Sequence, residues 1–318
     1  MAVSGAARPG TAARAPRGRG TTLRLAPARV RLAAHPVTLA SAYAGQVTSE
    51  DGLTGDDELT GDDGLSTDHV AEREVLRAWR RTAAEAVLLD GFHAVKHALR
   101  FGADVSHVLT RDRAALGALA GELAPDVVGE LAGRAVEVAD AVLRELVPRA
   151  HPTGVAALAA RRDRAVNLAA LTAVPRRAPV IVLEDPRNLG NVGAVVRLAA
   201  GLGATGVVTT GTADPWHPNA VRGGAGLHYA TAVERVTLGS LPPGPLYVLD
   251  PEGADLRTVT LPDDAVLAFG TERHGVSAAL KARADHTLRL PMHPSVSSYN
   301  LATSTAMTLY HWTLTRTA

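Results

Sequence analysis

The feature that most constrains the fold is a series of short apolar segments in the second half of the chain. They are PVIVLED (179–185), GVVTTG (206–211), LYVLD (246–250), AVLAFG (265–270) and LRLPM (288–292). Polar and apolar residues hardly alternate within them, which is typical of strands in a parallel sheet with both faces covered. Helices are predicted between and after these strands, notably over 193–203, near 217–226 and over 298–314. Residues 179–318 are therefore predicted to form an α/β domain.

A smaller α/β unit is predicted before this domain, over residues 71–165. Helical spacing at 74–80 is followed by a strand-like run at 85–91, an amphipathic helix at 92–102 and a second strand at 105–110. Residues 128–147 contain a helix or a strand–helix pair, and 151–161 form a turn and an apolar strand. The segment 166–178, which ends near Pro175 and two arginines, is predicted to link the two units.

Charge is segregated at the amino-terminal end, although the formal net charge of the chain is only +1. Residues 1–48 carry seven arginines and no acid, whereas residues 49–68 carry eight acids and no base. Residues 1–70 are too polar and glycine-rich to bury a core, so they are predicted to be a disordered extension. Because the remainder is only mildly basic, any contact with nucleic acid must be a local patch. Arg161, Arg162 and Arg164 form one candidate, and a solvated linker is the alternative.

The chain contains no cysteine. Disulfides, thiolate metal sites and a cysteine nucleophile are therefore excluded, and a reducing, cytoplasmic location is expected. No apolar run approaches the length of a membrane span. His93 and His97 are four apart on a predicted helix but lack the glutamate of an H-E-x-x-H site, so no metal is predicted.

The hexapeptide GLGATG (201–206) matches the glycine pattern of dinucleotide-binding loops. Such loops lead from a strand into a helix, so that helix amides meet the phosphates. GLGATG has the opposite order, because it follows a predicted helix and precedes a predicted strand. A helix carboxyl end carries partial negative charge and repels phosphate. The glycines are therefore predicted to be structural, with Gly201 or Gly203 capping the helix.

The loop before that helix has a different character. EDPRNLGNVGAVVR (184–197) leaves a strand and enters a helix that carries Arg197 among apolar residues. Gly190 and Gly193 allow close backbone approach, while Asn188 and Asn191 can bridge loop amides or contact a ligand. Arg197 is either a functional group or a structural arginine held by a salt bridge or by its apolar stem.

Three motifs in this order resemble those of the SpoU/TrmH family of RNA ribose 2′-O-methyltransferases, within the knotted SPOUT class. They are N-x-G-x-x-x-R at 191–197, G-x-E-x-x-G at 270–275 and L-P-M-x(5)-S-x-N at 290–300. Residues 74–161 are similar to the ribosomal-protein-like substrate-binding domain that precedes many such catalytic domains. The resemblance implies a trefoil-knotted parallel-sheet domain after a small α/β domain, and a homodimer.

The resemblance also implies the site. S-adenosylmethionine is expected against Gly270, Leu290 and Tyr299, contacted largely through the backbone. Arg197 is expected at the ribose 2′-hydroxyl, with Asn191, Glu272, Ser298 and Asn300 ordering the site. A guanidinium is an awkward base because it stays protonated at neutral pH, so Arg197 is either an atypical base or an orienting group. Pro294, Tyr299 and Ala302 depart from the family's usual residues. Because these positions lie in the motif expected to bind the donor, affinity for S-adenosylmethionine is the property that the resemblance predicts least well.

The function expected from these observations is S-adenosylmethionine-dependent 2′-O-methylation of structured RNA, with 23S rRNA favoured over tRNA. Two alternatives are a tRNA methyltransferase and a non-catalytic RNA-binding or ribosome-assembly factor with the same fold. Neither a membrane nor DNA is expected as a partner.

Overall fold

The computed structural model describes residues 67–147, 149–271 and 273–316, which belong to one compact unit of the chain. Most of the predicted extension, residues 1–66, lies outside this range. Helix α1 (Thr67–Thr82) contains the last residues of the range 1–70. Within the described residues, no helix is both long enough and apolar enough to cross a membrane.

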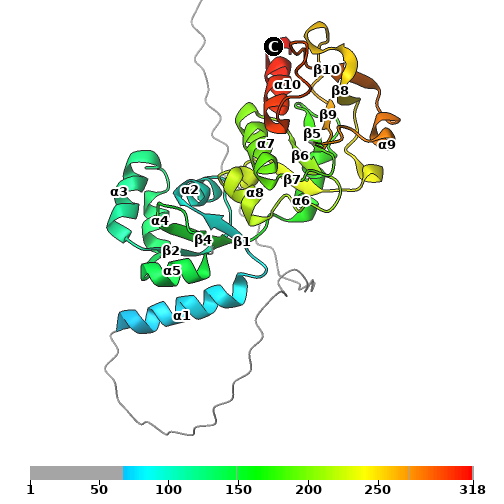
Figure 1. Ribbon diagram of the computed structural model, residues 1–318. Coiled ribbons are helices and arrows are strands. Elements are labelled where there is room, and N and C mark those ends of the chain that lie inside the picture. The colour runs from blue at the N-terminus through cyan, green and yellow to red at the C-terminus, as the bar shows by residue number, and fades with distance from the viewer. Residues whose placement is uncertain (1–66, 148, 272, 317–318) are drawn as a thin grey trace, which may run out of the picture. The chain divides into compact units, whose positions relative to one another are not determined.

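The first sheet has four strands in the order β1-β4-β2-β3 (Figure 1). These strands are β1 (Val87–Asp90), β2 (Val105–Thr110), β3 (Ala135–Glu137) and β4 (Val155–Ala159). Strand β4 runs antiparallel to β1 and β2, whereas β3 runs parallel to β2. The helices of this unit, besides α1, are α2 (Phe92–Arg100), α3 (Arg113–Leu123), α4 (Val128–Arg134) and α5 (Asp140–Leu146). Residues 128–147 thus form a helix, a strand and a second helix, one element more than the sequence predicted.

The second sheet has six parallel strands in the order β10-β8-β9-β5-β6-β7. They are β5 (Val180–Leu183), β6 (Gly206–Thr209), β7 (Ala232–Arg235), β8 (Leu246–Asp255), β9 (Val266–Phe269) and β10 (His286–Arg289). The associated helices are α6 (Arg164–Leu171), α7 (Leu189–Leu202), α8 (Pro218–Gly223), α9 (Ala278–Lys281) and α10 (Leu301–Thr315). The parallel α/β domain predicted from the apolar runs is confirmed.

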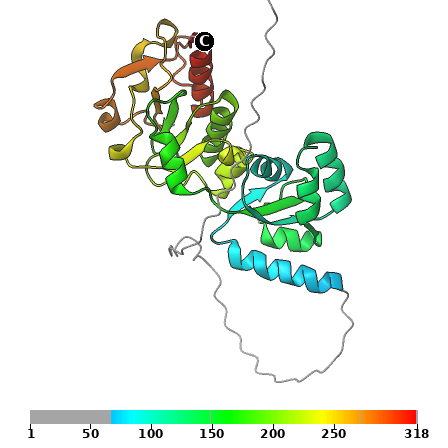
Figure 2. The ribbon, with the colours of Figure 1, turned by 180° about the vertical axis from the view of Figure 1, so that it is seen from behind.

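Both faces of this sheet are buried, as the lack of alternation predicted. Successive side chains of a strand point to opposite faces. Ile181 and Leu183 accordingly share one core with Val195 of α7 and Leu309 of α10. Val180 and Val182 share the other core, with Leu171 of α6 and Leu280 of α9. Both ribbon views place α7 and α10 side by side (Figures 1 and 2).

Two elements begin elsewhere than predicted. Helix α7 starts at Leu189, because Asn188 caps it by accepting hydrogen bonds from the Gly190 and Asn191 amides. Helix α10 starts at Leu301 rather than 298, because Asn300 caps it. Ser298 and Tyr299 therefore belong to the loop before α10. The prediction for GLGATG is confirmed: Gly203 ends α7 with φ of 73°.

Helix α6 falls across the predicted linker, 166–178. Its Asn167 is fully buried and donates from its side-chain amide to the Val233 carbonyl of β7 at 3.0 Å. The neighbouring arginines are likewise engaged. Arg164 and Arg161 both lie within ion-pair distance of the buried Glu234, at 2.6 and 3.7 Å. Residues 161–171 are thus packed onto the second sheet.

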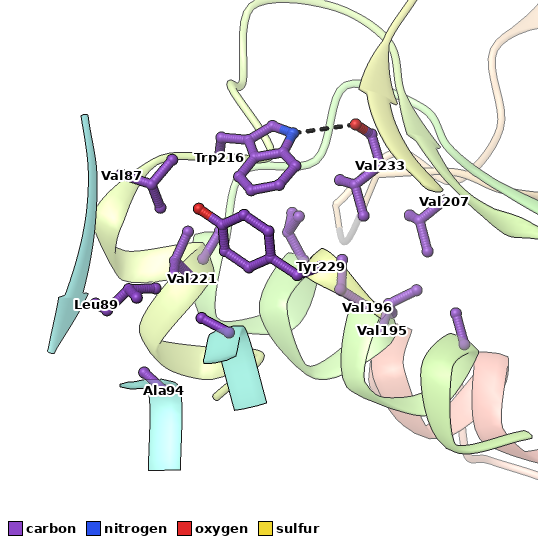
Figure 3. Close-up of a cluster of buried hydrophobic side chains, with 14 of the residues drawn as sticks. Val87, Leu89, Ala94, Val195, Val196, Val207, Trp216, Val221, Tyr229 and Val233 are labelled. Atoms are coloured by element: carbon purple, nitrogen blue, oxygen red, sulfur yellow. Dashed lines mark hydrogen bonds between the residues drawn. The ribbon is translucent and has the colours of Figure 1, made fainter. Parts of the chain in front are cut away.

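One buried cluster joins elements of the two sheets (Figure 3). Val87 and Leu89 of β1 face Val221 of α8, next to Trp216 and Tyr229. The Trp216 indole donates to the Val233 carbonyl at 3.0 Å, so its polar atom is satisfied inside the cluster. Because β1 and α8 contact each other directly, the first unit is held against the domain that carries the three motifs.

Candidate active site at the carboxyl ends of the parallel strands

A cavity of about 490 Å³, the β9 cavity, lies where β8, β9 and the segment after β10 meet. Ligands of open parallel sheets bind at these carboxyl ends. Four of the residues predicted from the second and third motifs line it: Gly270, Leu290, Ser298 and Tyr299. Its wall combines apolar side chains, such as Phe269 and Leu301, with polar and charged ones, such as Ser298 and Arg273.

The loop after β9 is built around glycine. Thr271 and Gly275 exchange backbone hydrogen bonds of 2.9 and 3.1 Å, and Gly275 has φ of 66°. A Cβ atom added at Gly270 would lie 2.0 Å from the carbonyl carbon of Gly275, so only glycine fits there. The Ser277 amide donates to the buried Glu184 carboxylate at 2.8 Å, which ties the far end of the loop to β5. Glu272 lies outside the described residues.

The first and third motifs meet through their asparagines. The Asn300 side-chain amide donates to the Asn191 side-chain oxygen at 3.1 Å, across 109 positions of sequence. Asn300 also caps α10 by accepting from the Ala302 and Thr303 amides. Neither asparagine lines the β9 cavity. The pair therefore braces the amino ends of α7 and α10 against each other.

Tyr299 and Ser298 occupy the loop that closes the β9 cavity. Tyr299 is 38% exposed, and its hydroxyl donates to the Pro291 carbonyl at 3.0 Å. This bond pins the tyrosine across the loop that follows β10, so the residue that departs from the family pattern has a structural partner. Ser298 is exposed and lines the cavity beside it.

Arg197 lies apart from the other predicted residues. Because α7 begins at Leu189, Arg197 is two turns into the helix, and the six residues from Asn191 rotate it by about 120° away from that side chain. It lines neither the β9 cavity nor the adjoining cavity lined by Asn188 and Asn219. Arg197 is exposed, and no described residue forms a hydrogen bond or ion pair with it. The alternative of a salt-bridged structural arginine therefore finds no support.

The surroundings of Arg197 are cationic. Partial burial, followed by the positive charges of Lys96 and Arg197, lowers the pKa of His93 below its ordinary value. His93 and Lys96 belong to α2, so the exposed face of that helix and Arg197 lie near each other. His97, the other histidine of the predicted pair, donates from Nδ1 to the Ala225 carbonyl oxygen at 2.8 Å.

A second cavity, the α7 cavity, of about 1110 Å³ adjoins the first. Its wall comes from the first motif's loop, including Asp185, Arg187 and Asn188, and from Asn219 of α8. Thr271, Arg273 and His274 line both cavities. The second and third motifs, together with the loop that precedes the first motif, therefore surround two adjoining spaces that share lining residues.

Asp250 is a site residue that the sequence analysis missed. It lines the β9 cavity and is only 9% exposed. Burial opposes its ionisation, but the hydrogen bonds from Lys281 and from the Glu252 amide outweigh burial, so the pKa of Asp250 lies below its ordinary value. Its signal was a carboxylate at the end of the apolar run LYVLD, a position where parallel strands present ligands.

No group of three or more His, Cys, Asp or Glu side chains that could hold a metal ion is found within the described part of the chain. The cavities instead combine backbone, hydroxyl and guanidinium groups. Such linings suit an organic ligand and a polyanion. The two ligands would meet at Thr271, Arg273 and His274, which line both cavities.

Comparison with known proteins gives a consistent family. Residues 178–310 match the sequence model of the SpoU rRNA Methylase family. The 23S rRNA (guanosine(2553)-2′-O)-methyltransferase of Bacillus subtilis is 26% identical over 262 residues, covering 76% of this chain and 96% of that protein.

Solved structures agree at the level of the fold. An S-adenosylmethionine-bound rRNA methyltransferase from Sinorhizobium meliloti superposes with a TM-score of 0.60 at 22% identity, covering 75% of this chain and 92% of that one. The SpoU methyltransferase AviRb from Streptomyces viridochromogenes, in complex with the same cofactor, gives 0.58 at 24% identity, with 76% and 96% covered.

Proposed function

We propose that this chain, whose residues 178–310 match the SpoU rRNA Methylase family, is a member of that family and methylates a ribose 2′-hydroxyl of structured RNA with S-adenosylmethionine as donor. The observation that carries the proposal is the convergence of the second and third motifs, and of the loop before the first, around two adjoining cavities that share Thr271, Arg273 and His274. Adjoining spaces that share lining residues can hold donor and acceptor side by side, which is the arrangement that direct group transfer requires.

The β9 cavity fits the methyl donor. Its volume of about 490 Å³ lies within the range of about 300–1,000 Å³ for small-molecule sites. Gly270 lets the loop after β9 fold back closely on Gly275 at the cavity, and the apolar part of the wall at Phe269 and Leu290 suits a purine face. The ionised Asp250 adds an acceptor for hydroxyl or ammonium groups. S-adenosylmethionine supplies a methyl group on a sulfonium, which needs no metal and no covalent enzyme intermediate.

The protein's own contribution is positioning. Holding two reactants in line can provide about 7–11 kcal/mol of the barrier reduction. The Asn191–Asn300 bond fixes the two loops that flank the cavities, and Ser298 presents a hydroxyl at the donor side. The α7 cavity receives the RNA nucleotide, with Arg273 at the wall between the spaces.

Arg197 is assigned to orienting the RNA rather than to accepting a proton. Its exposed position beside Lys96 and His93 suits a phosphate, and it lies outside both cavities. Glu272, in the second motif, is the conventional candidate for the proton acceptor, because carboxylates perform this role in many enzymes.

23S rRNA is the proposed substrate. The Bacillus subtilis 23S rRNA methyltransferase aligns over 96% of its own length and 76% of this chain, so the likeness extends well beyond residues 178–310. The first α/β unit, 67–160, is correspondingly proposed to bind substrate. A tRNA substrate and a non-catalytic ribosome-assembly role are the alternatives.

A homodimer and a trefoil knot complete the proposal. Tyr310 and Leu314 are 58% and 68% exposed, and their spacing of four puts them on one face of α10. A second copy would cover this face. The strand order supports the knot, because β10 lies at the sheet edge beyond β8 while α10 returns to pack on α7.

The test is methyl transfer from labelled S-adenosylmethionine to unmodified 23S rRNA and, separately, to unmodified tRNA. Wild type, Arg197→Ala and Glu272→Gln are compared, and alkaline hydrolysis detects the resistant 2′-O-methyl dinucleotide. The expected result is a resistant dinucleotide from 23S rRNA only. Arg197→Ala is expected to raise the KM for RNA more than it lowers kcat, and Glu272→Gln to lower kcat.

Other outcomes select the alternatives. A resistant dinucleotide from tRNA alone would assign the tRNA activity. Label on a base would overturn the ribose assignment. Wild-type protein that fails to bind S-adenosylmethionine in a calorimetric titration would favour the non-catalytic role.

A further inference from the structure

A groove of about 690 Å³, the arginine groove, lies on the side of α5 and α8, away from the β9 cavity. Four guanidinium groups line it and only one carboxylate, Asp140. The arginines are Arg111, Arg144, Arg149 and Arg222. This excess of positive charge in one concave surface attracts a polyanion.

These arginines differ in what they contact. Arg222 forms an ion pair of 2.9 Å with Asp90, which is 8% exposed, and donates to the Arg149 carbonyl at 2.8 Å. Arg111 donates to the Pro152 carbonyl at 2.6 Å, and Arg144 pairs with Asp140. Arg149 is exposed, and no described residue forms a hydrogen bond or ion pair with its side chain. Three arginines of the groove are thus held by protein groups, and among the described residues Arg149 alone of the four has no side-chain partner.

The arginine groove and the candidate active site share a lining residue. Asn219, in the first turn of α8, lines both the arginine groove and the α7 cavity. Arg273 then lines both the α7 cavity and the β9 cavity. Arg273 is exposed and, like Arg149, has no hydrogen bond or ion pair from its side chain to the described residues. The arginine groove and the candidate active site therefore each have a guanidinium, of Arg149 and of Arg273, that no other described residue binds.

We propose that the substrate RNA strand runs from the arginine groove past Asn219 into the α7 cavity, with Arg149 and Arg273 binding its phosphates. This path rests on the proposed function, because it leads to the cavity assigned to the target nucleotide. A guanidinium binds phosphate through two parallel hydrogen bonds, and these contacts set the register of the strand.

The arginines near the junction of the two units differ in whether they are available to bind phosphate. Arg161 and Arg164 are held by Asp214 and Glu234, and Arg162 donates to the Tyr229 and Thr231 carbonyls. These three form a basic run in the sequence but are engaged within the fold. Arg149 is not part of any such run.

The experiment measures binding of an unmodified 23S rRNA transcript by fluorescence anisotropy over a range of salt concentrations. Arg149→Ala and Arg273→Ala are each expected to weaken binding and to reduce the slope of log K against log salt by about 0.9. Arg283→Ala is the matched control, because Arg283 is also exposed and unpaired among the described residues but lines none of these spaces.

Asn219 tests whether the spaces form one path. Asn219→Lys is expected to tighten RNA binding and Asn219→Glu to weaken it, each about tenfold or less. Calorimetric titration with S-adenosylmethionine and circular dichroism follow the same variants. Retained folding and donor affinity in Arg149→Ala and Asn219→Glu show that any loss belongs to the RNA.

The two proposals fail in different ways. Wild type that methylates RNA, with Arg149→Ala and both Asn219 variants binding RNA as wild type does, would overturn the path alone. Wild type that neither binds nor methylates RNA would overturn the proposed function and the path with it. Equal losses in Arg283→Ala and Arg149→Ala would reduce the path to a general effect of charge.

Discussion

His228 illustrates how one buried side chain carries a cost that depends on pH. It is fully buried against Trp216, with ring centroids 5.2 Å apart, and its Nε2 lies 2.9 Å from the Pro215 carbonyl oxygen. The carbonyl accepts, so Nε2 carries the hydrogen. Nδ1 has no hydrogen-bond partner in the described part of the chain. Burial lowers the pKa of His228 to about 4.

The folded state therefore resists protonation that the unfolded chain accepts at about pH 6.5. The stability contributed by neutral His228 is complete above this value and is lost as the pH falls toward 4. At about 1.4 kcal/mol per pKa unit, roughly 2 kcal/mol should be lost between pH 7 and 5. Urea unfolding at both pH values should show this loss in wild type, and a smaller one in His228→Gln. An equal loss in the two proteins would contradict the assignment.

At the scale of the element, α7 contains two glycines with opposite environments. A Cβ atom at Gly193 would lie 2.2 Å from the Ala220 carbonyl oxygen and 2.6 Å from the Gly224 amide of the adjoining α8. A Cβ atom at Gly201 would meet nothing within 4 Å. Gly193 permits close packing of α7 on α8. Gly201 makes no such contact, and it only lowers the helix propensity of α7.

Gly193→Ala should lower the free energy of unfolding by about 1–3 kcal/mol, the usual range for overpacking. Gly201→Ala, its matched control in the same helix, should raise it by about 0.5–1 kcal/mol, because alanine is the better helix former. Urea unfolding at pH 7 measures both. Gly193→Ala with wild-type stability would mean that α7 and α8 do not approach as closely as described.

Some features of the helices could be predicted from neighbouring residues, and others could not. The cap positions Asn188 and Asn300 and the left-handed Gly203 follow from neighbouring residues, and Gly203 could be predicted. The link between Asn191 and Asn300 could not, because it depends on two helix ends brought together by the sheet. Arg197 was expected with them, but the rotation of α7 turns it toward α2.

At the scale of the whole molecule, the exposed apolar face of α10 is the feature that a single chain leaves uncovered. Leu314→Glu should convert the proposed dimer to a monomer, because the charge would have to be buried at the interface. Sedimentation velocity should give a dimer for wild type and for Leu123→Glu, a matched change at a residue 40% exposed on α3. A monomeric wild type would overturn the dimer, and a dimeric Leu314→Glu would place its interface elsewhere.

The sequence by itself determined the parallel α/β domain, five of the six strands of its sheet and the structural role of GLGATG, because these features depend on hydrophobic patterns and on residues adjacent in the chain. The resemblance of its motifs to the SpoU/TrmH family pointed to Gly270, Leu290 and Tyr299, which line the β9 cavity. Strand β7 and helix α9 were not predicted. Only the tertiary structure decided that Arg149 is uncommitted while Arg161 and Arg164 are paired, that Asn219 joins two cavities, and that Asp250 faces the β9 cavity. Pairing and access depend on which surfaces meet in space, and a local pattern carries no record of its distant partner.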